Sequence, residues 1–567
     1  TSLYADYQPL VVVDGFPVAN GFRDINPNDV ESVTVLKDAA AASIWGARSA
    51  NGVIVVVTRK SKMKGKVQVE ANALVRIGQK LDLSTVLTTA SSEDQVFYEK
   101  MAFDNGWIAP LNDVFTYLNT SMSLAKEYMY DFANGKILEE DMNKGLEKLR
   151  QLNNRKQIRK YLLENPITQQ YSLSISNSTD RAKNYMSVMY ENTGGNVISN
   201  DIDRWRINFN NQSNVFKWLD FNIGVNIHYV DSEFSGPTIG EINDLSPYEM
   251  ILNEDGSYAT QLKKNREQLA KIPAGVLPND DWSYNILREV RARKYTREEL
   301  NTRLQVGVLL RFAEGITFDS KFQYELNRLE TEYLDKEDSY LARDLVNTYI
   351  DYDQASSTVK TQFLPQGGIL RSSMTKVKNY SWRNQVNLMR SCGEKHDINA
   401  IVGFEISQFD RLDRTNPCVY GYNSKKMTST PLPFGAYSVN KQGQKVQIKT
   451  ITGQNQDGIY TMGNESFGTE TLFASRLDRF VSVYGNAAYT FDGKYSLSGS
   501  FRSDASNFIS EKASYRWAPL WSVGGLWNLH REQFMHSVES WLNALSIRLT
   551  YGFNGNAETS TSPVTLV

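Results

Sequence analysis

The sequence predicts a mainly β protein, in which a transmembrane antiparallel β-barrel follows a small α/β unit at the start of the chain. Three observations predict this class. Segments of two-residue alternation recur from Lys66 onward, short connections alternate with very long ones, and no uninterrupted apolar stretch approaches the ~18 residues of a membrane helix. The strands of a membrane barrel alternate apolar and polar residues, so the mean hydropathy of −0.44 does not exclude a membrane protein.

Composition narrows the class further. The 567 residues suffice for more than one domain, and a formal net charge of −2 gives no reason to expect nucleic acid as a partner. The 30 Tyr and 10 Trp, against two Cys and four His, favour an extracytoplasmic β protein. A strand between Cys392 and Cys418 carries the chain roughly 25 Å or more, so we expect no disulfide. Thr1 opens the chain without a visible targeting signal, which suggests a cleaved signal or a fragment.

The first sixty residues read as a compact β-α-β unit. A strand, "PLVVVDGFPV", is closed by Asp14 and Gly15, and "VESVTVLK" forms a second strand. Asp38 can cap a short helix through "AAAASIW", which Gly46 ends. After the turn pair Asn51 and Gly52, "VIVVV" is apolar on both sides, so we expect it to be buried on both faces.

The alternating segments have one apolar and one polar face. In "LDFNIGVNIHY" the apolar set includes Phe221, Ile223 and Val225, with Asp220 and His228 opposite. We expect roughly thirteen such strands. Aromatic residues near strand ends are typical of interfacial girdles, although they could instead fill a soluble core: Trp205, Trp218, Tyr229, Tyr324, Tyr489 and Tyr495.

The long connections span residues 81–168, 232–300, 329–376 and 410–476. A sandwich has no reason to place nearly all long connections at one end, whereas outer-membrane barrels have short periplasmic turns and long extracellular loops. The first connection is helical in parts ("SSEDQVFYEKMAF", "EEDMNKGLEKLRQL"), and we expect amphipathic helices folded onto the loop.

Several stretches resemble a known family. "LVVVDGFPV" and "INPNDVESVTVLKDAAAASIWGARSANGVIVVVTRK" resemble the end of the plug domain of SusC/RagA-type TonB-dependent outer-membrane transporters of Bacteroidetes, with Trp45 where the family usually has Tyr. "YGNAAYTFDGKYSLSGSFRSDASNF" and "LSIRLTYGFNGN" resemble later strands of its barrel. The resemblance gives the structural signature of the plug as Asp14, Gly15, Asp38, Trp45, Gly46, Arg48, Asn51 and Gly52.

The resemblance also implies an organisation. Residues 1–64 would be the C-terminal part of an internal α/β plug, and residues 65–567 a portion of a barrel of about 22 strands. The family's signal peptide, TonB-binding segment and remaining barrel strands would then lie before Thr1 and after Val567.

The residues give no reason to expect an enzyme, a cofactor or a metal site. His530 and His536 lack a metal-ligand spacing, and "NEDGSY" and "NQDGIY" read as turns because they lack a calcium loop's first ligand and late glutamate. We interpret Arg288 to Leu300 as a solvated loop leading into a strand. The substrate-binding residues stay unknown, although loops and the upper plug surface are where a ligand would bind.

The favoured hypothesis is an outer-membrane transporter of a Gram-negative bacterium, in contact with lipid and not with nucleic acid. The resemblance implies import of oligosaccharides or oligopeptides, energised by the inner-membrane TonB complex and lidded by a SusD-like surface lipoprotein. Two alternatives stay open: a siderophore or vitamin receptor without a lid, and a soluble secreted adhesin or glycan-binding protein.

Overall fold

The structure is a computed structural model of the chain. It describes residues 9–18, 21–22, 25–36, 45, 51–61, 64–107, 121–270, 272–348, 350–353, 356–362, 364–393, 395–430, 438–439, 445–446, 471–507, 517, 519–538 and 540–553. Within these ranges, no helix is at once long and apolar enough to cross a membrane.

The beginning of the chain forms a small four-stranded sheet with the order β2-β1-β4-β3. Its elements are β1 (Leu10–Val13), β2 (Phe16–Pro17), the short helix η1 (Pro27–Asp29), β3 (Val30–Leu36) and β4 (Val53–Thr58). Asp14 and Gly15 connect β1 to β2 with positive φ angles of 51° and 95°, as a tight two-residue hairpin requires. The turn expected at these two residues is therefore confirmed.

Strand β4 is central in the small sheet, parallel to β1 and antiparallel to β3. Each face carries a small apolar cluster, one around Val13 and Val56 and the other around Val12 and Val53. The clusters are too small to cover β4 completely. Its Ile54, Val55 and Val57 stay partly exposed, so the burial expected on both faces is only partial.

The rest of the chain builds one large antiparallel sheet, in which consecutive long strands pair in chain order from β5 to β25. Thirteen strands follow this path in the described part of the chain, as expected, and β5 and β25 are its two edges. The strands are β5 (Val67–Ile77), β6 (Ile167–Ser178), β7 (Ala182–Gly194), β8 (Asn200–Phe216), β9 (Leu219–Phe234), β12 (Arg293–Ala313), β13 (Ile316–Asp335), β16 (Gly368–Cys392), β17 (His396–Thr415), β22 (Leu472–Phe491), β23 (Tyr495–Ser506), β24 (Pro519–Trp527) and β25 (Ile547–Phe553).

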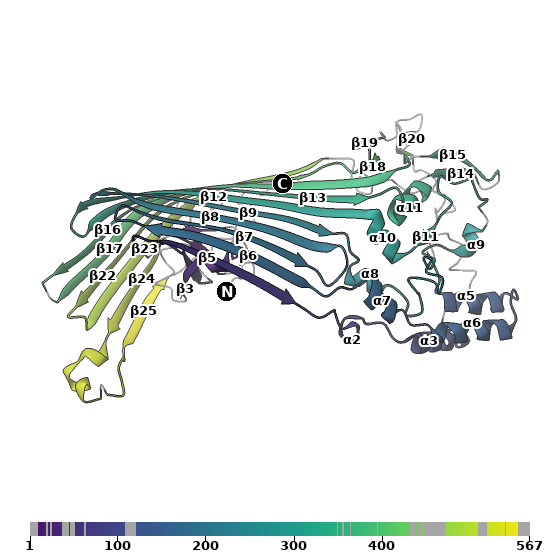
Figure 1. Cartoon of the computed structure of the whole chain (residues 1–567), viewed down its shortest axis with the longest axis horizontal. Helices are drawn as coiled ribbons and strands as arrows, with labels where there is room; N and C mark the ends of the chain where they lie inside the picture. Colours follow the sequence, from purple (N-terminus) through teal and green to yellow (C-terminus); the bar gives the residue numbers. More distant parts are fainter. Residues whose placement is uncertain are drawn as a thin grey trace.

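The connections are asymmetric (Figure 1). Turns of two or three residues join the strands at one end of the sheet, at 179–181, 217–218, 314–315, 393–395 and 492–494. The long connections lie at the opposite end, at 78–166, 235–292, 336–367 and 416–471. One longer connection, 528–546, contains η3 (Leu529–Arg531) and η4 (Gln533–Val538) and lies at the short-turn end, against this trend.

The strands run several residues into the ranges expected as loops. The pairing of β12 with β13 begins at Arg293 and Asp335, whereas the sequence pattern places this boundary near Leu300 and Leu329. The extra residues are rich in charge on both faces, so they lose the alternation of hydropathy while their backbones continue to pair. Hydropathy therefore marks the apolar band of each strand and not its full length.

The long connections contain short helices and strands of their own. The first has α2 (Leu83–Val86), α3 (Ser92–Asp104), α5 (Leu124–Ala133), α6 (Glu139–Gln151) and α7 (Arg155–Tyr161); the second has α8 (Ile239–Asn243), β10 (Gln261–Leu262), α9 (Arg266–Leu269), β11 (Ser283–Tyr284) and α10 (Ile286–Ala292). The third has α11 (Tyr340–Thr348), β14 (Ile350–Asp353) and β15 (Thr358–Gln362); the fourth has β18 (Val419–Asn423), β19 (Thr428–Ser429), β20 (Ser438–Val439) and β21 (Lys445–Val446). Helices α3 and α6 confirm the two helical segments expected in the first connection.

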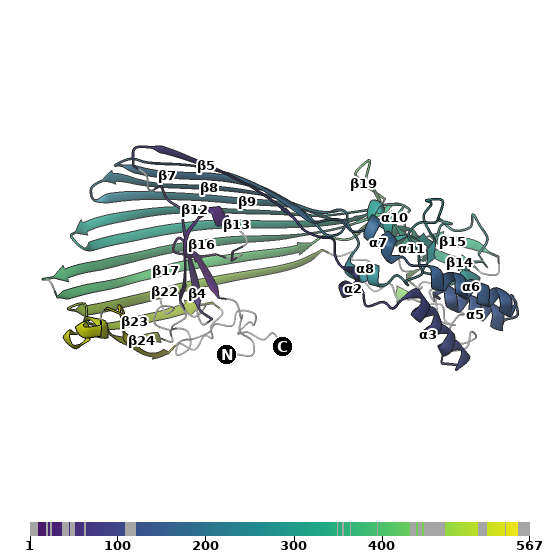
Figure 2. The ribbon, with the colours of Figure 1, turned by 60° about the horizontal axis from the view of Figure 1, so that its bottom comes forward.

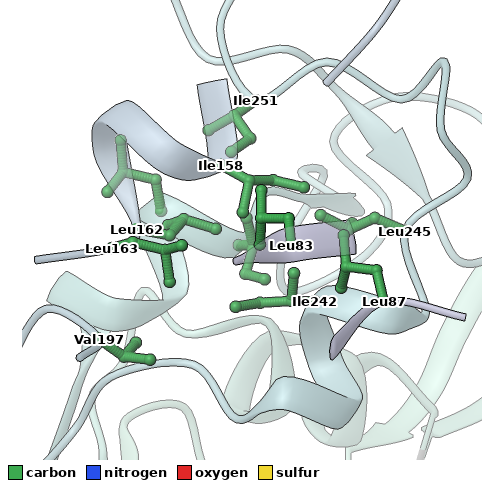
Figure 3. Packing of buried hydrophobic residues seen from close by; sticks show 11 residues of the cluster. Leu83, Leu87, Ile158, Leu162, Leu163, Val197, Ile242, Leu245 and Ile251 are labelled. Atoms are coloured by element: carbon green, nitrogen blue, oxygen red, sulfur yellow. The ribbon is translucent and has the colours of Figure 1, made fainter. Parts of the chain in front are cut away.

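The first two long connections share a hydrophobic core (Figure 3). Leu83 and Leu87 from the α2 segment pack with Ile158 of α7, Ile242 of α8 and Val197 of the β7–β8 turn. A second cluster joins α3, α5 and α6 to Tyr248. These connections therefore form a folded layer over one end of the large sheet.

The segment from Arg288 to Leu300 differs from the expectation of a solvated loop. It begins inside α10 and continues directly into β12. Its charges are paired: Arg288 lies 2.6 Å from Asp281, and Arg293 lies 2.7 Å from Glu241. Because Arg288 and Arg293 each have an acidic neighbour in the same connection, these two charges stabilise a folded segment.

Burial in the large sheet is inverted relative to a soluble protein. Large apolar side chains are exposed on one face, among them Phe221, Phe322, Val402, Phe404, Val481, Val483, Leu497, Phe501 and Val523. Polar side chains are buried on the other face, among them Ser187, Asn208, Asp220, Asn301, Gln323, Glu325, Ser381, Glu405 and Ser482. Phe221 is 37% exposed and its strand neighbour Asp220 is 1% exposed, so the expected face assignment of "LDFNIGVNIHY" is confirmed.

Aromatic side chains line the exposed face near both ends of the strands. Trp205 packs against Tyr190 on the long-loop side, with a ring distance of 4.6 Å, and Trp218 stacks on Phe216 beside a short turn. The expected girdle residues are exposed or partly exposed, which argues against a core role: Trp205, Trp218, Tyr229, Tyr324, Tyr489 and Tyr495. Cys392 and Cys418 lie near opposite ends of the sheet, and both thiols are free.

Candidate functional site

The small sheet lies against the polar face of the large sheet (Figure 2), and three groups of hydrogen bonds hold it there. The first group surrounds Asp29, at the end of η1. Its carboxylate is only 4% exposed and accepts hydrogen bonds from the Tyr185 hydroxyl at 2.7 Å, the Ser187 hydroxyl at 2.7 Å and the Asn208 amide at 3.2 Å. These uncharged donors on β7 and β8 solvate a buried carboxylate in place of water.

The second group begins at the β1–β2 turn. The Asp14 carboxylate accepts a hydrogen bond from the Thr58 backbone N–H at 3.0 Å and one from the Thr58 hydroxyl at 2.7 Å. The Asn210 amide of β8 in turn donates to the Thr58 hydroxyl oxygen at 3.2 Å. Asp14 therefore ties the turn to the end of β4, and Thr58 ties β4 to the large sheet.

The third group surrounds Arg383 of β16. Its guanidinium forms a buried ion pair with Glu405 of β17 at 2.7 Å and donates to the Gly15 carbonyl oxygen at 3.0 Å. It also lies over the Trp45 ring, 4.5 Å from the ring centre. The planar fork of arginine can make all these contacts at once, so Arg383 connects two segments of the small sheet to the wall.

A cavity of about 290 Å³ opens beside this third group, between the small sheet and β16, β17 and β22. Leu10, Pro17 and Val18 of the small sheet line one side. The wall contributes aromatic rings from Phe409 and Phe480, polar groups from Asn379, Ser381 and Ser407, and charged groups from Glu405, Arg411, Arg476 and Asp478. Apolar surface with a few converging polar groups is typical of a small-ligand site.

The cavity lies on the long-loop side of the Arg383–Glu405 pair. In the β16–β17 register Arg383 is opposite Glu405 and Asn379 is opposite Phe409, and β17 continues from Phe409 toward its end at Thr415, where the longest connections are. A molecule entering between the long connections would therefore meet this cavity before it met the Arg383 group.

A separate charge cluster stabilises the second long connection. Asp281 is close to the guanidinium groups of Arg288 at 2.6 Å and Arg343 at 3.0 Å, and it accepts hydrogen bonds from Ser283. Burial opposes ionisation of Asp281, but the Ser283 and Arg288 hydrogen bonds outweigh it and lower the pKa of its carboxyl group to about 2.

Comparisons with known proteins agree with this geometry. Residues 4–53 match the TonB-dependent Receptor Plug Domain family. TonB-dependent receptor SusC of Bacteroides thetaiotaomicron is 46% identical over 70 residues, which is 11% of this chain and 7% of SusC. A solved structure of the RagAB peptide importer in its closed-closed state covers 98% of this chain with a TM-score of 0.69 at 19% identity. Residues 4–53 therefore match a TonB-dependent receptor plug, and the chain is similar to SusC in sequence and to RagAB in fold.

The similarity to other receptors extends along the chain. TonB-dependent receptor P26 of Formosa agariphila is 24% identical over 98% of this chain, and receptor P39 of the same organism is 21% identical over 97%. The chain spans 46% and 43% of their lengths, and 55% of the RagAB chain. It therefore spans about half the length of the relatives it matches.

The signature residues expected from the sequence lie at two kinds of position. Asp14, Gly15 and Trp45 lie at the contacts between plug and wall described above. Asn51 and Gly52 form the turn before β4, where Gly52 has a φ of +91° and an added Cβ would lie 3.1 Å from the Leu36 carbonyl oxygen. Asp38, Gly46 and Arg48 lie outside the described residues.

The wall residues of the plug contacts were not expected from the sequence. Tyr185, Arg383 and Glu405 are polar residues in regular alternation, and every inward strand position has that pattern. A usable signal for Asp29 was its position after "INPN", where a short helix can end with a carboxylate directed at the wall. For Arg383 no local signal exists, because Gly15 is 368 residues away in the sequence.

The weaker candidates are turns and isolated side chains. "NEDGSY" closes a turn in which Asp255 accepts hydrogen bonds from the Ser257 backbone and hydroxyl, whereas "NQDGIY" lies outside the described residues. The Nδ1 atom of His530 lies 3.0 Å from the Leu545 carbonyl oxygen. Among the described residues, no group of three or more His, Cys, Asp or Glu side chains could hold a metal ion.

Proposed function

We propose that this receptor imports oligosaccharides or oligopeptides across the outer membrane of a Gram-negative bacterium, energised by TonB. In this proposal residues 1–64 are the C-terminal part of the plug and residues 65–567 a portion of the barrel. The observation that carries it is the plug, held through Asp29, Thr58 and Arg383 on the polar face of a sheet whose other face is apolar.

The dimensions of the apolar face support a membrane position. Trp205 and Phe216 mark the two aromatic ends of the band on β8 and are eleven residues apart. At ~3.3 Å per residue and a tilt of ~40° this separation corresponds to about 28 Å along the membrane normal, close to the ~25 Å apolar band of outer-membrane barrels.

The plug contacts suit a part that stays in place and can still be released. They consist of hydrogen bonds and one cation–π contact, and Gly15 and Trp45 of the signature take part in them. Because such contacts are short-ranged and directional, a pull on the plug can break them one group at a time. We assign that pull to the inner-membrane TonB complex.

The similarity to RagAB, a peptide importer, supports a ligand larger than a siderophore and a SusD-like lipoprotein partner over the long connections. The folded layer shared by the first two connections offers a firm base for such a lid.

Uptake in cells tests the proposal. Cells that express the receptor should accumulate a labelled oligosaccharide or oligopeptide, and loss of TonB should abolish this accumulation while the receptor level in the outer membrane stays unchanged. Purification from native outer membranes should also recover a surface lipoprotein. Equal accumulation with and without TonB would refute energised import, and a receptor that stays monodisperse without detergent would refute the membrane position.

A further inference from the structure

The cavity beside the Arg383 group has two arginines on the side nearer the long connections. Arg411 of β17 and Arg476 of β22 are direct cross-strand partners on the polar face. Like charges in directly opposed positions destabilise a sheet, so such a pair needs a compensating reason. Each arginine has an acid two residues further along its own strand, Asp413 at 2.7 Å and Asp478 at 2.7 Å.

The accessible charge of the cavity is positive. Glu405 and Asp478 are 3% and 5% exposed, and each is held by an arginine at 2.7 Å. The side chains of Arg411 and Arg476 are 47% and 36% exposed despite their ion pairs. A ligand in the cavity therefore meets guanidinium groups, while Glu405 and Asp478, the two acids of the lining, are covered by their own partners.

The remaining lining fits a flat or apolar group next to an acidic one. Phe409 and Phe480 supply aromatic surface, and Pro17 and Val18 of the plug supply apolar surface opposite. The volume of about 290 Å³ is at the lower end of the ~300–1,000 Å³ typical of ligand pockets. The space suits one sugar ring or one amino-acid residue of a longer chain.

We propose that this cavity binds a carboxylate-bearing unit of the imported ligand, with the carboxylate between Arg411 and Arg476 and the rest of the unit against Phe409 and Phe480. This inference rests on the proposed import function and names the chemistry of its ligand. The carboxylate can come from a uronic acid in an oligosaccharide or from an acidic peptide. In either case the bound unit touches both wall and plug.

Equilibrium binding to the intact, detergent-solubilised receptor tests the inference. The probes are trigalacturonate and its methyl ester, and the tripeptide Gly-Phe-Glu and its fully amidated form. We expect one acid to bind about ten- to a hundredfold more tightly than its neutral counterpart, as a charge-assisted hydrogen-bond pair provides. The probe with this preference identifies the source of the carboxylate.

Three variants locate the preference. Arg411→Gln should remove most of it. Arg414→Gln is the matched control because Arg414 belongs to the same strand and its guanidinium lies over the Phe473 ring instead of in the cavity. Arg411→Lys should restore part of the preference, which a misfolded Arg411→Gln receptor could not explain.

The inference is overturned if neither acid binds more tightly than its neutral form, or if Arg411→Gln and Arg414→Gln have the same effect. Neither result bears on the proposed TonB-dependent import, because the uptake assay in cells measures energised import of any ligand. Loss of TonB dependence together with a preserved acid preference would instead refute the import function and keep the cavity as a binding site.

Discussion

Replacing Arg383 by lysine should loosen the plug without breaking the barrel wall. The ammonium group of Arg383→Lys can still pair with Glu405, so the buried carboxylate keeps a counter-charge. A lysine does not reproduce the planar fork that reaches the Gly15 carbonyl and covers the Trp45 ring together. The bond is worth about 1–2 kcal/mol and the ring contact about 1 kcal/mol.

Hydrogen exchange measures this loss directly. A reduction of about 2–3 kcal/mol in the local opening free energy speeds exchange about 30- to 150-fold. The reporting amides are those of Asp14 and Val18, which donate to the Val56 and Val11 carbonyl oxygens. Mass spectrometry of plug peptides should show faster exchange there, while peptides of β16 and β17 stay protected.

The matched control is Arg204→Lys. Arg204 of β8 is also an inner-wall arginine in an ion pair, at 2.6 Å from Glu191 of β7, and it donates a hydrogen bond to Thr193 of β7. This control should leave plug exchange unchanged. If both lysine variants accelerate plug exchange equally, Arg383 is a general wall residue and the reasoning about its contacts is wrong.

Three further predictions concern other groups. Asp29→Asn keeps the shape of the side chain but removes its charge, so plug exchange should rise about tenfold, and a double-mutant cycle with Tyr185→Phe should give a coupling of about 1 kcal/mol. The lowered pKa of Asp281 means that its ionised carboxylate stabilises the folded connection above the ordinary pKa of 3.8, and that this stabilisation is lost as pH falls through about 2. Pepsin should therefore cleave the second long connection faster at pH 2 than at pH 4. Asp281→Asn should reduce that difference. Gly52→Ala should destabilise the plug by about 1–2 kcal/mol in the same exchange assay because of its positive φ, whereas Gly499→Ala, with its nearest neighbour at 3.9 Å, should cost less.

The sequence allowed the apolar band and the plug turn to be predicted because both depend on local patterns. The alternation around Phe221 reflects two environments on opposite faces of one strand, and the pair Asp14 and Gly15 supplies the two positive φ angles of a tight turn. The helices α3 and α6 were predictable for the same reason.

The strand ends and the plug contacts could not be predicted in this way. Above the apolar band both faces of β12 and β13 meet polar surroundings, so composition no longer distinguishes strand from loop although pairing continues to Arg293 and Asp335. Arg383 and Glu405 look like other inward polar residues, and their role depends on a partner hundreds of residues away. The segment from Arg288 was misread because Arg288 and Arg293 have acidic partners in the same connection, which local charge density does not reveal.

The most direct test of the membrane and plug assignment compares two positions on one strand. In a background with Cys392→Ser and Cys418→Ser, Val402→Cys and Ser407→Cys would each carry a fluorescent label in receptor reconstituted into lipid. Val402 is 64% exposed on the apolar face, and Ser407 lines the cavity beside the plug. We predict that nitroxide-bearing lipid quenches the label at 402 and that aqueous iodide quenches the label at 407. Iodide quenching at 402, or lipid quenching at 407, would contradict the account.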